Sequence, residues 1–408
     1  MAFAFPEPVI PNHVPADLVR PFPFVFGMTT DQDPFNVLAA SVHEGPDLTY
    51  APHAYPGGSP AWIPRRMEDM RAIYLDTDHF TTQDFSPFSK LTGGTWINSP
   101  VELDPPAHGP FRQMVNPAFT PKAMAALEGK IREYAVGYID GFAARGSCEF
   151  MGDFAFEFPI KVFMELMGLP HDRVAEFMEW EMNLLHNHDL SKIADATRKV
   201  VAYLSAEIDD RRANPRDDLI SFGVAGQIEG RPLTQDELVG FMFNLFIGGL
   251  DTVSTNMGLQ FWHLATHPED QAALRANPAE IPHAIDELMR AYGAVTTFRT
   301  CKKETTIRGV TIKPGDKVAM STTLAGRDPA EFDNPGIVDF SRRPRHVGFG
   351  FGIHTCVGMH LARRELRVAM EEFLARIPPF TLETGHTVTC HMGMIQPVAL
   401  PLVWTPAG

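Results

Sequence analysis

Residues 349–358 constrain this chain more than any other segment of its sequence. They read Phe-Gly-Phe-Gly-Ile-His-Thr-Cys-Val-Gly and run into an amphipathic stretch, residues 357–376, that predicts a helix. The glycines allow the backbone to bend tightly and to approach a flat body closely. Cys356 lies where the loop meets the helix, where the helix dipole and free N–H groups favour a thiolate. A thiolate held in this way is a strongly donating ligand for iron.

The other cysteines offer no competing site. Four cysteines, at positions 148, 301, 356 and 390, stand too far apart for a zinc knuckle or a redox dithiol. A cysteine that carries chemistry therefore acts alone. The alternative is a structural glycine turn with one packed cysteine, since most lone cysteines are inert packing residues.

A long helix is predicted over residues 234–267. Thr234 and Glu237 fit a capping box at its start, and Pro268 ends it. Its middle holds Gly-Gly-Leu-Asp-Thr at residues 248–252. Two glycines there cost about 1 kcal/mol each relative to alanine, which indicates close approach of another body or a local break. Asp251 could relay protons and Thr252 could donate a hydrogen bond, whereas a helix kink without chemistry is the alternative.

The remaining pattern is mostly helical with small sheets. Strand-like pieces are expected near residues 61–63 and over 305–321, and the tail 387–404 is expected to form a hairpin. Helices are expected over about 66–76, through 121–213 and from 281 to Gly293. The last of these contains Glu287 and Arg290, which can pair on one helix face. No linker divides the chain into separate domains.

Composition excludes several classes of protein. With 408 residues, 44% hydrophobic and 21% charged, the chain is an ordinary globular protein large enough to enclose a cofactor. Its net charge of −15 argues against nucleic acid as a partner. The prolines in residues 1–15 do not fit a signal peptide, and the apolar run 241–250 is shorter than a membrane span. A soluble, cytoplasmic protein is expected.

Taken in order, these motifs resemble those of the cytochrome P450 family, and in particular those of bacterial camphor hydroxylases. Further shared segments are Phe-Pro-Ile at 158–160, His-Leu-Ala-Arg-Arg-Glu at 360–365 and Ala-Leu-Pro-Leu-Val-Trp at 399–404. The resemblance implies one domain, 1–408, that is mainly α with small β-sheets. Its β-containing region would cover about 1–110, its helical bulk 111–300 and its haem loop and hairpin 301–408. Haem b would lie between the long helix and the helix after the cysteine loop.

The resemblance also implies a role for particular residues. Cys356 would ligate the iron, while Asp251 and Thr252 would deliver protons for the cleavage of O2. The haem and its propionates would be held by His108, Arg112, Arg299, His354, Phe349, Gly350 and Gly358. A buried network of Glu287, Arg290 and Arg342 would hold the cysteine loop in place.

Departures from the camphor hydroxylases fall where substrate would bind. Trp96 replaces a tyrosine that donates a hydrogen bond, Asn244 a leucine and Val101 a threonine, while Thr297 replaces an aspartate near a propionate. The expected pocket comprises Trp96, Val101, Asn244, Ile247, Gly248, Val295, Met394 and Ile395. It suits a mostly apolar cyclic molecule, of terpenoid or norisoprenoid type, other than camphor.

The sequence contains no flavin or nicotinamide region and no cysteine cluster for an iron–sulfur centre. The resemblance implies electrons from NADH through a flavoprotein reductase and a [2Fe–2S] ferredoxin, which would dock near Arg71, Arg112 and Arg363 on a monomer. Two other readings of the sequence stay open. One is a haem-thiolate sensor or carrier without turnover. The other is a hydrolase in which His354 activates Cys356.

Overall fold

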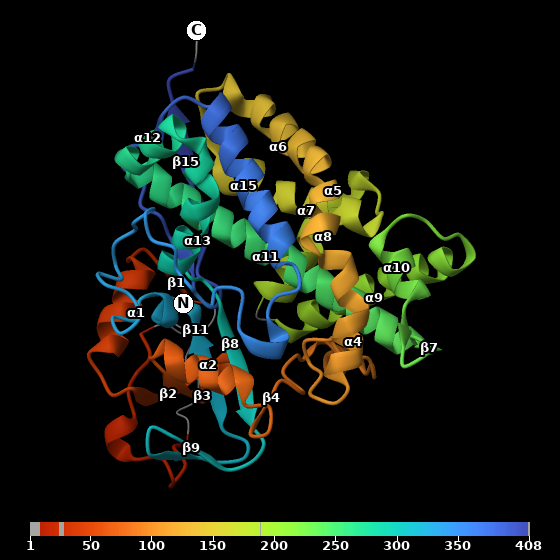
Figure 1. The fold of residues 1–408 in the computed structure, drawn as a ribbon, viewed down its shortest axis with the longest axis vertical. Helices are drawn as coiled ribbons and strands as arrows, with labels where there is room; N and C mark the ends of the chain where they lie inside the picture. The colour runs from red at the N-terminus through yellow and green to blue at the C-terminus, as the bar shows by residue number, and fades with distance from the viewer. Residues whose placement is uncertain (1–8, 24–27, 188, 407–408) are drawn as a thin grey trace. The chain divides into compact units, whose positions relative to one another are not determined.

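A computed structural model describes residues 9–23, 28–187 and 189–406 (Figure 1). The chain divides into two compact units, each assembled from stretches far apart in the sequence. The first, which we call the sheet unit, comprises Met1–Thr81, Thr255–Cys356 and Pro378–Thr405. The second, the helical unit, comprises Thr82–Ser254, Val357–Ile377 and Pro406–Gly408.

The sheet unit is organised around five strands in the order β2-β3-β11-β8-β4. All neighbours pair antiparallel except β3 and β11, which are parallel. Their bounds are β2 Leu48–Tyr55, β3 Ser59–Pro64, β11 Lys317–Ser321, β8 Thr296–Cys301 and β4 Phe80–Thr81. Its helices are α1 Pro34–His43, α2 Met67–Leu75, α12 Pro268–Ala276, α13 Ile281–Ala291 and α14 Thr322–Gly326.

Smaller strand pairs complete the sheet unit. A turn with Arg308 and Gly309 at positive φ joins β9 (Thr305–Ile307) to β10 (Val310–Ile312). The expected C-terminal hairpin is shorter than predicted: β13 (Cys390–His391) pairs with β14 (Gln396–Pro397), and β1 (Thr29–Thr30) pairs with β13. The end of the predicted hairpin, β15 (Pro401–Trp404), pairs instead with β12 (Phe380–Leu382), because a strand pattern does not specify its partner.

The helical unit packs around a large apolar core. The aromatic rings of Phe177 and Trp180 lie in this core, 5.1 Å apart, and Phe246 lies 5.4 Å from Phe177. Its helices are α3 Phe88–Thr92, α4 His108–Val115, α5 Pro121–Ala126, α6 Glu128–Ala143, α7 Glu157–Met167, α8 Val174–Leu185, α9 Leu190–Ala213, α10 Leu219–Ala225 and α15 Met359–Arg376. Short strands occur at β5 Ser147–Glu149, β6 Gln227–Ile228 and β7 Arg231–Pro232.

Helices α6 and α15 lie side by side in the helical unit (Figure 1). Charged pairs connect them: Arg132 Nη2 lies 2.7 Å from Glu371 Oε2, and Arg367 Nη2 lies 2.6 Å from Glu128 Oε2. These contacts fix α15, which continues from the cysteine loop. The helix begins at Met359, two residues later than predicted, so Cys356 stands three residues before the first helical residue.

Helix α11 (Gln235–Thr266) crosses from the helical unit into the sheet unit. The predicted capping box is confirmed: Glu237 donates its N–H to Thr234 Oγ1 at 3.2 Å, and Thr234 donates its N–H to Glu237 Oε2 at 2.8 Å. Among the described residues, α11 alone is long and apolar enough to span a membrane, and 72% of its most apolar window is buried within the protein. Such burial is typical of a core helix.

Candidate functional site

The cysteine loop, residues 349–358, is a tightly turned segment that belongs to the sheet unit up to Cys356 and then leads into α15. Gly350 and Gly352 both have φ of +72°, in the left-handed region that favours glycine. A side chain at Gly352 would also meet the carbonyl oxygen of Tyr74 at 3.0 Å. Cys356 donates its N–H to the carbonyl oxygen of Phe349 at 2.8 Å, which closes the loop. The glycines therefore serve the conformation that the sequence predicted.

Cys356 is the one exposed cysteine, while Cys148, Cys301 and Cys390 are buried. Burial raises the pKa of all three buried thiols, which keeps them protonated. The exposed thiol of Cys356, on a rigid loop, is consequently the one available to bind a metal.

Arg299 is a buried cation of the sheet unit. Its side chain belongs to β8 and is only 8% exposed. Its guanidinium lies 5.2 Å from the ring centroid of Tyr74, and Nη1 donates to the carbonyl oxygen of Phe298 at 2.8 Å. The hydroxyls of Tyr74 and Thr297 lie 2.6 Å apart. An ordered guanidinium of this kind suits an anionic group such as a propionate.

A charged network around a fully buried ion pair supports the segment before the cysteine loop. Arg290 donates to both carboxylate oxygens of Glu287 at 2.7 and 2.8 Å, and both side chains are 0% exposed. Arg342 donates to Glu287 Oε1 at 2.7 Å, so the predicted third member does join the pair. The Asp339 N–H donates to the same oxygen at 3.0 Å. Arg290 also donates to the carbonyl oxygens of Gly326, Pro335 and Ile337.

Helix α11 continues through Gly248 and Gly249 without interruption. A side chain at Gly249 would meet the ring of Phe163 at 3.1 Å, so the close approach predicted for the glycines occurs there. Gly248 is exposed, and nothing lies within 4 Å of the position its side chain would take. The Thr252 hydroxyl donates to the carbonyl oxygen of Gly248 at 3.1 Å. The Thr252 hydroxyl is therefore anchored one turn along α11 from Gly248, where the missing side chain leaves open space.

Asp251 is buried, at 1% exposed, and belongs to a cluster that sequence reasoning missed. Its Oδ2 lies 3.1 Å from His186 Nε2, and the same nitrogen lies 3.5 Å from Glu181 Oε1. Nothing in the sequence joins a helix end near residue 186 to the middle of α11. Only the packing of α8 against the helical core brings these residues together.

Helix α4 carries the two cationic candidates predicted near the Asp-Pro-Pro turn. His108 is buried, and burial lowers its pKa, so this side chain favours the neutral form. Arg112 is half-buried, and its Nε donates to Asn116 Oδ1 at 2.8 Å. The loop residues His354 and Phe349 are also half-buried, and Gly358 is the N-cap of α15.

The predicted substrate residues lie in different surroundings. Trp96 is 6% exposed, and its ring lies 4.6 Å from that of Phe243 at a tilt of 47° in the core of the helical unit, where Ile247 also packs. In the helical unit, Asn244 is half-buried and Val101 exposed. In the sheet unit, Val295 and Met394 are half-buried and Ile395 is buried. The burial of Trp96 favours core packing over substrate contact, so the pocket stays a prediction.

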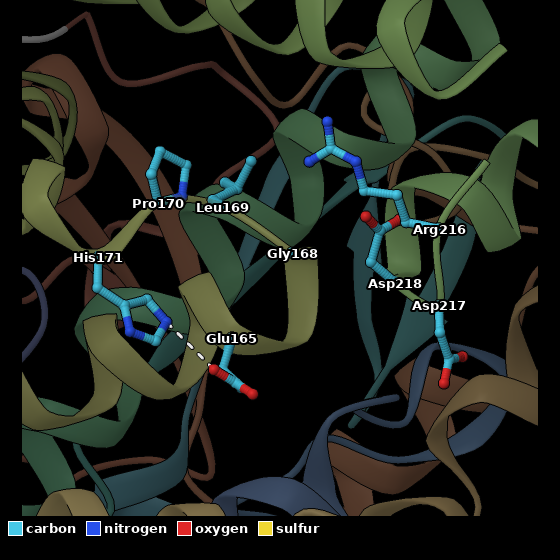
Figure 2. Close-up of a pocket in the computed structure, with 8 residues that line it drawn as sticks. All are labelled: Glu165, Gly168, Leu169, Pro170, His171, Arg216, Asp217 and Asp218. Carbon is cyan, nitrogen blue, oxygen red and sulfur yellow. Dashed lines mark ion pairs between the residues drawn. The ribbon is translucent and has the colours of Figure 1, made fainter. Parts of the chain in front are cut away.

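A surface pocket of about 500 Å³ in the helical unit is lined by none of the predicted residues (Figure 2). Charged groups dominate it, including Glu165, Arg216 and Asp217, and His171 Nε2 lies 3.3 Å from Glu165 Oε2. An open charged hollow is a poor match for an apolar substrate.

Comparisons with known proteins identify the family. The cytochrome P450 family model matches residues 160–401. Probable cytochrome P450 127A1 from Sinorhizobium fredii is 38% identical over 97% of this chain and 97% of its own length. The crystal structure of cytochrome P450 CYP101C1 is 34% identical with a TM-score of 0.88, covering 97% of this chain and 100% of that one. The chain belongs to the cytochrome P450 family.

Another relative of this P450 is mycinamicin IV hydroxylase/epoxidase from Micromonospora griseorubida, 34% identical over 86% of this chain and 91% of its own length. The expected fold class, mainly helical with small sheets, is confirmed. The chain is a P450 monooxygenase, an enzyme of a family that uses haem and O2.

Proposed function

We propose that this P450 is a haem-thiolate monooxygenase in which Cys356 ligates the iron, and that it hydroxylates a small, mostly apolar cyclic substrate of terpenoid or norisoprenoid type. The observation that carries the proposal is the cysteine loop. It holds the one exposed cysteine on a backbone closed by the Cys356–Phe349 hydrogen bond. The whole chain, 1–408, would act as one P450 domain, since relatives match 97% of it.

The residues present fit a haem. Cys356 offers an accessible sulfur, Arg299 offers an ordered buried cation for a propionate, and Gly248 leaves open space on one face of α11. Arg112 and His354 would bind propionates as well, with His108 beside them, and Phe349, Gly350 and Gly358 would shape the loop. Bound haem supplies the chemistry of O2 activation, and a thiolate ligand favours O–O cleavage.

Asp251 and Thr252 would deliver protons during O2 cleavage. Asp251 is buried and lies 3.1 Å from His186 Nε2, so its carboxyl group is shielded from bulk water. The Thr252 hydroxyl is anchored on the Gly248 carbonyl beside open space, so it can position a proton donor there. Removing either group should leave electron uptake from NADH intact, while fewer of those electrons would be used to form product.

Thr252→Ala should uncouple the enzyme. We expect NADH consumption to change by less than about threefold while product per NADH falls at least tenfold or so, with peroxide replacing product, because proton delivery typically contributes that much or more. Thr266→Ala is the matched control, since Thr266 makes the same bond to a carbonyl one turn back in the same helix. Unchanged product per NADH in Thr252→Ala would remove the role assigned to Thr252.

The substrate class rests on the sequence departures at the predicted pocket residues and on relatives. Cytochrome P450-terp from Pseudomonas sp. is 28% identical over 86% of this chain, and pentalenic acid synthase from Streptomyces avermitilis is 33% identical over 74%. A screen for the substrate-induced spin-state shift should find terpenoid or norisoprenoid ketones that bind more tightly than camphor. If macrolides bound tightly and no terpenoid or norisoprenoid did, the proposed substrate class would be wrong.

Electrons would come from NADH through a flavoprotein reductase and a [2Fe–2S] ferredoxin to a soluble, cytoplasmic monomer. Of the expected docking residues, Arg71 is engaged: it donates to Glu331 Oε1 at 2.9 Å and to the Arg345 carbonyl oxygen at 2.8 Å. Arg112 is engaged as well, through its donation to Asn116 Oδ1 at 2.8 Å, so Arg71, Arg112 and Arg363 all stay docking candidates.

The decisive experiment is a spectrum followed by turnover. Reduced, CO-bound protein made with ample haem precursor should show the red-shifted Soret band of thiolate-ligated haem. Protein without haem would favour the hydrolase reading. Product formation from NADH with ferredoxin and reductase then separates the monooxygenase from a haem-thiolate sensor or carrier, which would show the band and no product.

A further inference from the structure

Three of the predicted pocket residues lie on two short backbone segments of the sheet unit. Val295 lies in the connection between α13 and β8, and Met394 and Ile395 lie in the turn between β13 and β14. We call these three residues the apolar wall. Because their side chains offer no oxygen or nitrogen atom, the apolar wall can recognise a substrate only by its shape.

The turn that carries Met394 and Ile395 is fastened to α11 by a buried side-chain hydrogen bond. Gln396 Nε2 donates to Thr255 Oγ1 at 2.8 Å. Gln396 is 2% exposed and Thr255 is 0% exposed. Bonds between two side chains are a minority of protein hydrogen bonds, and a buried amide or hydroxyl is costly to leave without its partner. This bond therefore specifies where the turn lies against α11.

Thr322, the first residue of α14, holds the other segment of the apolar wall. Its N–H donates to the carbonyl oxygen of Val295 at 2.9 Å, and its hydroxyl donates to the same oxygen at 2.7 Å. The Val295 N–H donates to Thr322 Oγ1 at 3.1 Å. Both backbone groups of Val295 are thus bound, so the direction of its side chain is fixed.

Backbone bonds connect the two segments and extend the support. The Ile395 N–H donates to the carbonyl oxygen of Ala294 at 3.1 Å, which joins the turn to the residue before Val295. The Met392 N–H donates to the carbonyl oxygen of Met28 at 2.8 Å. Hydrogen bonds therefore link α11, the turn, the segment with Val295 and α14 into one support for the apolar wall.

A purely structural tie is the alternative role for a buried glutamine, and the sheet unit contains one. Gln271 in α12 is also 2% exposed. Its Nε2 donates to the carbonyl oxygens of Phe380 at 3.0 Å and Leu264 at 3.1 Å, and its Oε1 accepts the Phe380 N–H at 3.1 Å. Gln271 fastens β12, which carries no predicted pocket residue, whereas Gln396 directly follows two residues of the apolar wall.

We propose that Gln396, through its bond to Thr255, is a positioning residue that sets how far the apolar wall yields to a ligand. Thr322 has the same role for Val295. A wall held in this way favours compact, rigid, apolar molecules and rejects longer ones, so specificity depends on buried polar groups that do not touch the substrate. This inference rests on the proposed function, because it takes the apolar wall to face the substrate.

Two iron-binding probes that differ only in length test the apolar wall in the haem-loaded protein. The compact probe is 1-phenylimidazole, and the long probe, 1-(biphenyl-4-yl)imidazole, extends the same rigid axis by a second ring. In spectral titrations the wild type should bind the compact probe more tightly. In Gln396→Leu the ratio of the two Kd values should narrow about tenfold, the size expected from one lost hydrogen bond. Equal binding of both probes by the wild type, or an unchanged ratio in Gln396→Leu, would overturn the proposal.

Thr255→Val removes the same bond from its other side and should narrow the ratio equally. The double variant Gln396→Leu/Thr255→Val should narrow it no further, since one bond is lost only once. Additive narrowing would show that the two side chains act separately, which contradicts a role for their bond. Thr255→Val also serves as the test if Gln396→Leu does not fold and take up haem.

Gln271→Leu is the matched control. It should lower the unfolding midpoint, as Gln396→Leu does, and leave the ratio of Kd values unchanged, because Gln271 supports β12 and not the apolar wall. Equal narrowing in Gln271→Leu would assign the effect to a general loosening of the sheet unit and would overturn the proposal.

The outcomes separate this inference from the proposed function. Absence of the thiolate-type CO spectrum in the wild type would refute the proposed function itself. A narrowed ratio in Gln396→Leu, together with no terpenoid or norisoprenoid binding, would refute the substrate class and support the role of Gln396. A thiolate-type spectrum and terpenoid binding, together with an unchanged ratio in Gln396→Leu, would refute the role of Gln396 alone.

Discussion

Cys356→His should abolish NADH-driven monooxygenation, lowering product formation to background, while the protein still folds and retains haem. The imidazole occupies a similar position on the loop, which is held by backbone contacts, such as the Cys356–Phe349 bond, that do not involve the side chain. A neutral imidazole lacks the electron donation that a thiolate provides for O–O cleavage. The reduced CO spectrum should change from the thiolate type to the type of histidine-ligated haem.

Cys148→Ala is the matched control, because Cys148 is a buried thiol of the helical unit with no predicted role. It should keep the thiolate spectrum and the turnover number, with at most a modest loss of stability from the small cavity. If Cys356→His retained the thiolate spectrum, the iron ligand would have to be another cysteine. That result would contradict the assignment of Cys356 as the iron ligand.

Local chemistry was predictable where the sequence itself encodes it. The capping box at Thr234 and Glu237 depends on two side chains three residues apart, and the structure contains both of its hydrogen bonds. The loop glycines are needed by their own backbone angles, and Gly350 and Gly352 have them. Family resemblance added Arg342 to the Glu287–Arg290 pair, which spacing alone does not reach.

Features that depend on packing between distant segments could not be predicted from the sequence. His186 ends a helix whose pattern is merely amphipathic, and it meets Asp251 only because α8 packs in the same core. The partner of β15 was missed for the same reason: the strand pattern at Pro401–Trp404 fits many neighbours. Burial alone does not decide the substrate residues: Trp96 lies in the core of the helical unit, and its assignment to the pocket stays a prediction.

Arg290→Met should cost this P450 about 3–5 kcal/mol of stability, the usual result of removing one partner from a buried ion pair. Glu287 would keep only Arg342 as a charged partner. The carbonyl oxygens of Gly326, which is buried, and Pro335 would lose the donation from Arg290, while that of Ile337 would keep Arg342 as a donor. The unfolding midpoint, measured by calorimetry on the haem-loaded protein, should fall by roughly 5 °C.

The control for this change is Arg343→Met, which removes a cation adjacent to Arg342. Arg343 pairs with Glu280 at 3.0 Å, but the two side chains are 48% and 41% exposed, so its loss should cost less than about 1 kcal/mol. Because Glu287 also accepts the Asp339 N–H in the segment before the cysteine loop, Arg290→Met should release haem faster than Arg343→Met. Equal stability and equal haem release in the two variants would show that the network is dispensable, and that the loop holds Cys356 through its own backbone turns.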